Sequence, residues 1–347
     1  MANKLKQSAV LQRSSLKMSV VDGAKAYSEL RQMVVKAGVL ERSYGYYAVV
    51  TLIIFCGFGL SLYQLFVSNS YLLLTVWAII FAFFSVQIGG LLHDAGHRAI
   101  FKSSKVNDIF GQIIATLILF SYGDWKTTHN NHHAHPNQDD HDPDIDVPLS
   151  FTDERYRNRK GLIAVLRKYQ AYLYYPLGSF VLFRIRIKDF FHFWKTFGKR
   201  GIGERISFIT ALFLWFFLPF AVFDFPKALF LLLIVHIASG AYLLNVFAPN
   251  HKGMTELDSD VKISFLEQQI ITARNIHGHW LTDLFYFGLN YQIEHHLFPN
   301  TPRNKLKLLT PYVKAICRKY RFAYTSVSIL ETNKIILKEL HAVAKRS

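Results

Sequence analysis

The sequence predicts an all-α integral membrane protein, in which four transmembrane helices form two hairpins and a cytosolic helical cap holds a di-metal site. Three observations lead to this prediction: long uncharged apolar blocks, very short connections between them, and basic residues gathered on one side. The chain has 347 residues, of which 51% are hydrophobic, 15% aromatic and 18% charged, with a net charge of +16. This aromatic-rich composition excludes a disordered chain, and two cysteines in so long a chain exclude a disulfide scaffold.

Four apolar blocks contain no Asp, Glu, Lys or Arg, and His236 is the only histidine within them. They cover residues 46–66, 71–92, 206–223 and 228–248. Because a hydrocarbon core about 30 Å thick needs about 20 apolar residues of helix, each block is long enough to span it. Uncharged runs of this length disfavour the alternative of four buried helices in a soluble domain.

Short connections and one-sided charge define the expected topology. Residues 67–70 and 224–227 are long enough only for tight turns, so the blocks form two antiparallel pairs. Of the 40 Lys and Arg residues, 39 lie in the segments that this topology places together on one side. Cytoplasmic flanks are enriched in Lys and Arg, so we expect both termini and the site in the cytosol. The net charge is therefore attributed to topology and to a surface facing anionic headgroups, not to nucleic-acid binding.

Three segments are expected along the chain: a basic cytosolic N-terminal segment at 1–45, a membrane domain with its cap at 46–310, and a basic cytosolic C-terminal segment at 311–347. Two more apolar stretches are poorer spans, because 109–122 is only 14 residues long and 169–187 contains proline and arginine. We interpret both as helices in or dipping into the cytosolic interface. No secretory signal is expected, since the polar N-terminal segment has no apolar core.

Histidines cluster in three short motifs, HDAGH at 93–97, HNNHH at 129–133 and QIEHH at 292–296, with one more histidine after the fourth block. Spacings of three and four residues place imidazoles on one face of a helix. Imidazole suits Zn, Cu, Fe and Ni, and eight candidates exceed the four ligands of one zinc, so two metals are expected. The candidate ligands are His93, His97, His129, His132, His133, His251, His295 and His296.

Two other classes of metal-binding membrane protein fit less well. The HExxH pattern of zinc proteases is absent from the first motif, where Asp94 follows His93 and no Glu takes the general-base position. A metal transporter would need ionisable groups inside its spans, and His236 alone does not supply a pathway. A transporter remains the alternative from another class.

The three motifs resemble the histidine boxes of the membrane fatty acid desaturases. NYQIEHHLFP at 290–299, with Gln in place of the first histidine of box three, and TARN at 272–275 resemble the front-end, linoleoyl-CoA and acyl-lipid desaturase subgroup. The resemblance covers roughly residues 45–310. It implies a non-haem di-iron centre with two Fe ions and O2 as oxidant. The reaction that it implies introduces a cis double bond into a fatty acyl chain linked to CoA or to a lipid.

The resemblance also implies roles for individual residues. By position in the boxes, seven of the eight histidines are metal ligands, and His251 matches the histidine that follows the last span of the family. Gln292, Asp94 and Glu294 are candidate partners that orient ligands from outside the metal shell. Asn245 and His279 are left without a role, and no catalytic residue beyond the metal ligands and no acyl-binding residue is identified.

Electron supply is the point at which this sequence departs from many front-end desaturases. Those proteins carry a fused cytochrome b5 domain with a His-Pro-Gly-Gly motif, and that motif does not occur in this sequence. We therefore expect a separate carrier of cytochrome b5 or ferredoxin type, and a bacterial inner membrane is a plausible location. The basic surface suits an acidic carrier, although topology explains the same charge equally well. A fatty acyl hydroxylase on the same fold is the nearest alternative activity.

Overall fold

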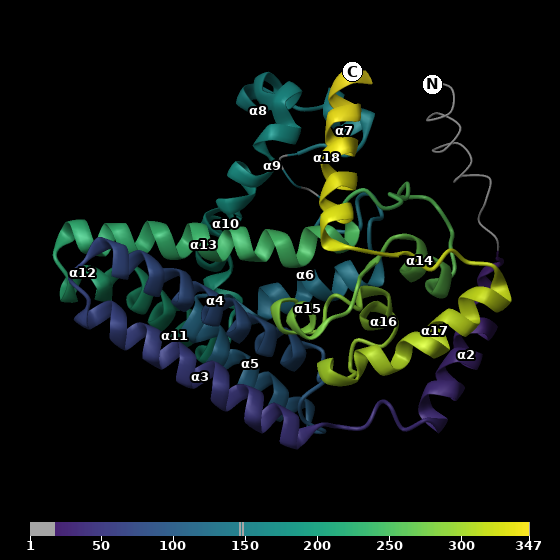
Figure 1. Cartoon of the computed structure of the whole chain (residues 1–347), viewed down its shortest axis with the longest axis horizontal. Coiled ribbons are helices and arrows are strands. Elements are labelled where there is room, and N and C mark those ends of the chain that lie inside the picture. Colours follow the sequence, from purple (N-terminus) through teal and green to yellow (C-terminus); the bar gives the residue numbers. More distant parts are fainter. Residues whose placement is uncertain (1–17, 146, 148, 347) are drawn as a thin grey trace.

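Long helices dominate the structure, a computed structural model that describes residues 18–145, 147 and 149–346 (Figure 1). Four helical stretches are long and apolar enough to cross a membrane: α3 (Tyr44–Val67), α4 (Tyr71–Gly96), the segment Ile202–Val222 and α13 (Phe225–His251). The third stretch consists of α11 (Ile202–Leu212), a π-helical turn η3 (Phe213–Phe217) and α12 (Leu218–Val222). All four predicted apolar blocks are therefore helical, and α4 packs against both α3 and α13.

Two of these helices continue past their apolar blocks. Helix α13 starts at an N-cap where the Asp224 side chain accepts a hydrogen bond from the Lys227 N–H at 2.9 Å, and it ends at His251. Helix α4 continues to Gly96, so His93 lies in its last turn. Both histidines follow their apolar blocks, as the sequence places them, but each lies at the end of the same continuous helix. The helices extend because their last turns are buried against other protein segments, so polar side chains are accommodated there.

The apolar segment 109–122 is broken into two helices. Helix α5 (Ser104–Ile118) ends at Leu119, which adopts a left-handed conformation with φ 54°, and α6 (Tyr122–Ala134) continues at 109° to it. The Trp215 indole donates to the Leu117 carbonyl at 2.9 Å, and the Arg186 guanidinium donates to the Ile118 carbonyl. These bonds satisfy carbonyls that a helix end leaves unpaired, as an apolar environment requires. Counted as one broken span, this pair would be a fifth membrane crossing.

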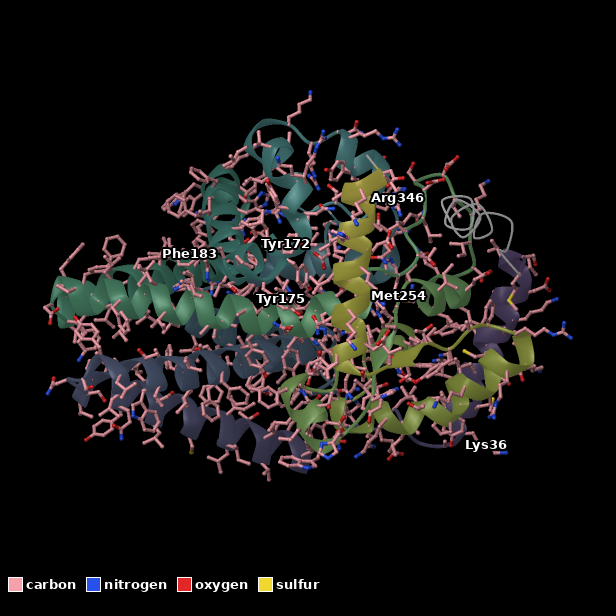
Figure 2. The ribbon with its side chains drawn as sticks, turned by 45° about the horizontal axis from the view of Figure 1, so that its top comes forward. Lys36, Tyr172, Tyr175, Phe183, Met254 and Arg346 are labelled. Carbon is pink, nitrogen blue, oxygen red and sulfur yellow. The ribbon has the colours of Figure 1, made fainter. Side chains whose placement is uncertain are left out.

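The segment 169–187 is also helical, and it lies against α13. It is divided between α9 (Gln170–Ser179) and α10 (Val181–Thr196), and Figure 2 shows Phe183 and Tyr175 along α13. The Phe183 ring stacks on the imidazole of His236 with 4.8 Å between ring centroids. The only histidine of the apolar blocks is therefore buried by packing, away from the histidine motifs. The membrane-interface position expected for α9 and α10 stays a prediction.

The remaining elements are α2 (Val20–Lys36), α7 (Asp153–Arg157), α8 (Gly161–Leu166), α14 (Phe265–Ile271), α15 (Trp280–Phe285), α16 (Gln292–Leu297), α17 (Leu306–Tyr320), α18 (Ile329–Arg346), the 3₁₀ turns η1 (Arg167–Tyr169), η2 (Phe197–Lys199) and η4 (Arg303–Lys305), and two short parallel strands, β1 (Asn275–Ile276) and β2 (Ser326–Val327). Several of these elements, among them α14 and α16, pack around the histidine-bearing ends of the helices.

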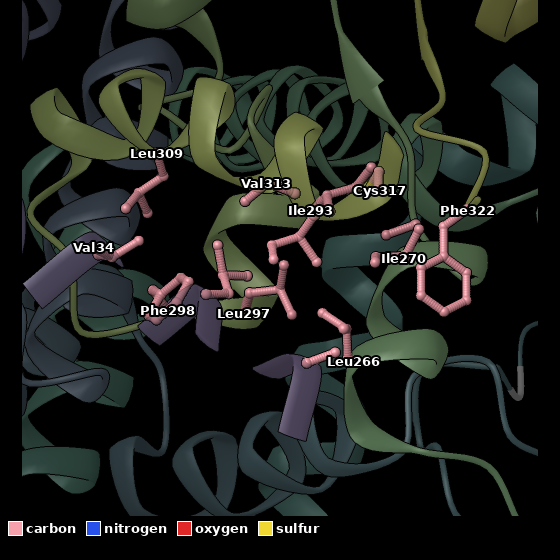
Figure 3. Packing of buried hydrophobic residues seen from close by; sticks show 14 of the residues in the cluster. Val34, Leu266, Ile270, Ile293, Leu297, Phe298, Leu309, Val313, Cys317 and Phe322 are labelled. Atoms are coloured by element: carbon pink, nitrogen blue, oxygen red, sulfur yellow. The ribbon is translucent and has the colours of Figure 1, made fainter. Parts of the chain in front are cut away.

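A hydrophobic core joins α2, α14, α16 and α17 (Figure 3). Val34 of α2 belongs to the same buried cluster as Ile270 of α14, Ile293 of α16 and Val313 of α17. Sequence segments more than 270 residues apart are thus held together, and α16, which carries box three, lies in the middle of them. The boundary expected at 310–311 falls inside α17, and residues 1–17 of the expected N-terminal segment lie outside the described residues.

Gly240 provides a test of the packing between α13 and α9. A Cβ atom at Gly240 would lie 2.1 Å from the Ser179 carbonyl oxygen. The substitution Gly240→Ala therefore forces the backbones of α13 and α9 apart. We expect a loss of about 1–3 kcal/mol of stability, measured as a lower Tm of the purified protein in detergent. The matched control is Gly59→Ala in α3, where a Cβ meets nothing within 4 Å. Equal melting of the two variants would contradict this packing.

Candidate metal centre

Five histidines from three helices converge in one group. They are His93, His97, His129, His133 and His295, and one ring nitrogen from each lies within 4.8 Å of the others. The last turn and C-cap of α4 supply the first two, α6 the next two, and α16 the fifth. Four of the five residues are buried, and His129 is partly buried. The group therefore unites all three sequence motifs.

Three other histidines form a second group beside the first. His132 of α6, His251 of α13 and His296 of α16 also offer ring nitrogens within 4.8 Å of one another, and all three are buried. The rings of His133 and His296 stack with centroids 4.2 Å apart, so the two groups are in contact. All eight histidines that the sequence singled out are thus gathered into two adjoining groups.

Helix geometry explains how one motif serves both groups. His129 and His133 are four residues apart on α6 and share a face, whereas His132 is rotated by about 100° from His133. The adjacent residues His295 and His296 on α16 diverge in the same way. Each of these helices therefore directs imidazoles into both groups at once.

Hydrogen bonds fix the orientation of every ring in the three-histidine group. The Nδ1 of His132 lies 3.0 Å from both carboxylate oxygens of Asp142. The Nδ1 of His251 donates to the Thr272 carbonyl at 3.1 Å. The Nδ1 of His296 donates to the Gln269 Oε1 at 2.8 Å. Since all three partners are acceptors, each Nδ1 carries a proton and Nε2 is the remaining candidate ligand atom of each ring. The His251 Nε2 also contacts the Gln292 amide.

The side chain of Gln269 ties two motifs together. Its Nε2 donates to the His133 carbonyl at 3.2 Å, which leaves its Oε1 as the acceptor for His296. Gln269 is fully buried on α14. One side chain thus sets the distance between α6 and α16 and the tautomer of a candidate ligand.

The charge state of the imidazoles also fits metal binding. Burial, reinforced by the neighbouring imidazoles, lowers the pKa values of His133, His295 and His296 well below their usual range. These rings are therefore neutral, which is the form that binds metals. Burial alone would raise the pKa of Asp142, but His132 and backbone N–H donors lower it to about 2, so its carboxylate stays charged.

The donor atoms have the spacing that a metal imposes. The Nε2 atoms of His97 and His129 are 2.9 Å apart, and those of His133 and His295 are 3.1 Å apart. Nitrogen ligands about 2.1 Å from one ion stand roughly 3 Å apart, so both pairs fit a shared cation. Among the described residues, the buried Nε2 atoms of His93 and His296 have no protein partner. The two groups therefore fit two imidazole-bound metal ions.

The three predicted orienting residues lie at different distances from the imidazoles. Gln292 Nε2 lies 3.0 Å from His251 Nε2, so this glutamine contacts a candidate ligand directly. Asp94 Oδ1 is 3.5 Å from His93 Nδ1. Glu294 accepts hydrogen bonds from the Asn275 amide and the Tyr324 hydroxyl at 2.6 and 2.7 Å, so it fastens α16 to β1 and to the chain before β2.

Asp94 has stronger partners than His93. Its Oδ2 accepts from the Arg303 Nε at 2.5 Å and from the Tyr47 hydroxyl at 2.7 Å. All of these residues are buried, so the ion pair holds the histidine end of α4 against α3 and against the turn before α17. Arg303 had no signal in the sequence beyond its place after box three.

Other residues considered from the sequence lie apart from the two groups. Asn245 Nδ2 donates to the Ala241 carbonyl of its own helix at 2.8 Å, and His279 is exposed at the N-cap of α15. Sequence reasoning missed Gln269 and the Thr272 carbonyl as ring partners. Gln269 precedes box three by 23 residues in a segment without a motif, and Thr272 precedes it by 20 residues, in the TARN segment. Only the fold brings them to the imidazoles.

Apolar helices of membrane length, and eight clustered imidazoles of which seven are buried, define a class, the helical integral membrane proteins with a histidine-lined site that could hold metal. The family model described as fatty acid desaturase matches residues 69–328, about three quarters of the chain. The chain therefore belongs to the fatty acid desaturase family. The resemblance to this family that the histidine motifs indicated is confirmed.

Characterised relatives agree with this assignment. The chain is 32% identical over 92% of its length to an acyl-lipid (9-3)-desaturase of Physcomitrium patens, and it spans 63% of that protein. It is 27% identical over 94% of its length to a Delta(8)-fatty-acid desaturase of Euglena gracilis, spanning 80% of that protein. A Delta(5) fatty acid desaturase of Caenorhabditis elegans is 27% identical over 84% of the chain, which spans 67% of that protein. These relatives support an enzyme of this type.

Gln269 allows a test of the site that does not depend on activity. We expect Gln269→Leu to lower metal affinity about 10–100-fold, because His296 loses the acceptor that fixes its ring. Metal content after dialysis against a graded chelator measures this. The matched control is Gln268→Leu, since the neighbouring Gln268 is also buried but donates only weakly, to Pro136 and Gln138. Equal metal retention by the two variants would remove Gln269 from the site.

Proposed function

We propose that this protein is an O2-dependent fatty acyl desaturase that introduces a cis double bond into an acyl chain at a di-iron centre. The observation that carries the proposal is the division of eight imidazoles, seven of them buried, into two adjoining groups with converging Nε2 atoms. Eight imidazoles exceed what one ion needs, and the membership of the family supplies the reaction class. Iron is among the metals that imidazole suits.

The proposal includes a topology. The four apolar helices cross the membrane as two hairpins, α3–α4 and Ile202–Val222 with α13, and most of the other elements form a cytosolic cap. Both termini and the histidine groups then lie in the cytosol, in a multi-pass membrane protein for which a bacterial inner membrane is a suitable location. The distribution of Lys and Arg supports this sidedness. The core around α16 supports a cap built from both ends of the chain.

In this proposal, iron when bound supplies the oxidising power that removes hydrogens from an unactivated methylene. The residues of the chain orient the candidate metal ligands, hold their helices in place and exclude water. Asp142, Gln269 and the Thr272 carbonyl orient three imidazoles through their Nδ1 atoms, so that Nε2 is the candidate ligand atom. Arg303 and Asp94 hold the end of α4 in place. The burial of seven of the eight imidazoles keeps bulk water from the reacting position.

Substrate and electron donor follow from the relatives and from the sequence. The relatives are named for acyl-lipid, Delta(8) and Delta(5) desaturation, so the substrate proposed here is a fatty acyl chain on a lipid or on CoA. Electrons come from a separate carrier of cytochrome b5 or ferredoxin type. The excess of basic residues suits an acidic carrier of either kind.

His132 tests the ligand assignment. His132→Ala removes an imidazole from the three-histidine group, so we expect activity to fall at least about 100-fold and iron content to fall, with membrane insertion unchanged. Iron per chain and product formation are measured on protein purified from membranes. The control is His341→Ala on α18, whose ring contacts Tyr172 instead of the imidazole groups. Full activity of His132→Ala would refute the assignment.

The product decides between the proposed reaction and its nearest alternative. We expect expression in a host without polyunsaturated lipids to yield a new cis double bond, located by mass spectrometry in the separate CoA and lipid pools. The double bond requires O2, because O2 is the proposed oxidant. A hydroxylated chain without a new double bond would show a hydroxylase instead.

A further inference from the structure

Helix α15 is short, and its apolar side chains point away from the protein. Of its six residues, Trp280, Leu281, Leu284 and Phe285 are between 42% and 67% exposed. Soluble surfaces rarely expose four large apolar residues side by side. In Figure 1, α15 lies beside α16, below α6 and the end of α13.

The one charged residue of α15 is turned inward. Asp283 Oδ1 accepts a hydrogen bond from the Asn290 amide at 2.8 Å, and the Tyr291 hydroxyl also bonds to this carboxylate. The helix is therefore arranged with its charge toward the protein and its apolar residues outward. This is the reverse of a helix that faces water on one side and a protein core on the other.

Two spanning helices hold the C-terminal end of α15. The Leu284 carbonyl accepts from Gln87 Nε2 of α4 at 2.8 Å, and the Phe285 carbonyl accepts from the Tyr242 hydroxyl of α13 at 2.7 Å. Gln87 Nε2 also donates to that hydroxyl at 2.8 Å. Carbonyls at the end of a helix need such partners where water is absent.

These contacts fix the depth of α15. Gln87 lies six residues before His93 on α4, or about 9 Å at 1.5 Å per residue, and Tyr242 lies nine residues before His251 on α13, or about 14 Å. Both distances run from the histidine ends toward the apolar centres of the helices. The Phe285 ring also contacts Phe83 of α4, with centroids 5.5 Å apart. Helix α15 is thus level with the apolar parts of α4 and α13, not with the cap.

We propose that α15 is immersed in the bilayer, with Leu281, Leu284 and Phe285 in contact with lipid acyl chains beside α4 and α13. Trp280, at the start of the helix, then lies at the membrane–water boundary that tryptophan favours. The exposed His277 and His279 precede it at the level of the headgroups. This inference rests on the proposed membrane insertion and adds a membrane contact that six residues are too short to signal in the sequence.

The immersion has a structural consequence for the metal site. Only six residues, 286–291, join α15 to α16, and five of them are buried. A lipid-embedded α15 therefore holds the helix that carries His295 and His296 at a fixed distance from the membrane surface, on its cytosolic side. An acyl chain entering from the same leaflet then has only a short path from the apolar layer to the site.

Spin-label accessibility tests the immersion in the full chain reconstituted in phosphatidylcholine vesicles. The unchanged protein carries one exposed cysteine, Cys56 on α3, which provides a label on a spanning helix, whereas Cys317 is buried. The variant Cys56→Ala/Leu284→Cys moves the label to α15. Cys56→Ala/Leu330→Cys is the matched control, because Leu330 is an exposed leucine on α18 of the cap. Collisions with O2, which concentrates in lipid, and with a water-soluble nickel chelate are compared.

We expect the label at residue 284 to resemble the label at Cys56, with a ratio of O2 to nickel collisions severalfold higher than at residue 330. Leu281→Cys provides a second position on the same face if the first variant inserts poorly. A label at 284 that resembles the one at 330, while Cys56 remains in lipid, would overturn the immersion of α15 alone. If Cys56 also resembled 330, the proposed membrane insertion itself would fail.

Discussion

The structure depends on placing eight imidazoles, seven of them buried, next to one another. Each buried polar nitrogen that lacks a partner costs about 1–3 kcal/mol, so a cluster of this size is stable only when both nitrogens of its rings are satisfied. In the three-histidine group, Asp142, Gln269 and the Thr272 carbonyl satisfy every Nδ1. The Nε2 atoms converge instead of pairing with acceptors. Bound metal ions would satisfy these atoms, and metal binding would then be coupled to folding.

The rest of the protein holds the helices that carry these rings. The ion pair between Arg303 and Asp94 is buried, and removing one partner of such a pair costs about 3–5 kcal/mol, since the other charge is left uncompensated. Arg186 and Trp215 act similarly at the break between α5 and α6, where they bind carbonyls that the bend exposes. Both sets of buried polar contacts fix the orientation of histidine-bearing helices, α4 and α6, from positions outside the histidine groups. The apolar helices provide most of the packing, and these few polar side chains fix how the helices are oriented.

The exposed apolar helix α15 lies close in the chain to a helix of the histidine site. Gln87 and Tyr242, both on spanning helices, bind the end of α15, and α15 leads directly into the helix that carries His295 and His296. The chemistry of an acyl chain requires this closeness, because the substrate and the lipid surroundings are equally apolar. A site far out in the cap would force the chain through water at a cost of about 0.8 kcal/mol per methylene.

The sequence by itself determined the features that are encoded locally. Twenty uncharged residues suffice to identify a spanning helix, and spacings of three and four residues suffice to put His129, His132 and His133 on neighbouring faces of one helix. The three motifs also identified the family. The tertiary structure alone decided that His132 and His133 belong to different groups, that α5 breaks at Leu119, and that Gln269 and Arg303 serve the site. These features arise from contacts between residues tens to hundreds of positions apart, and no local pattern of charge or hydrophobicity records such contacts.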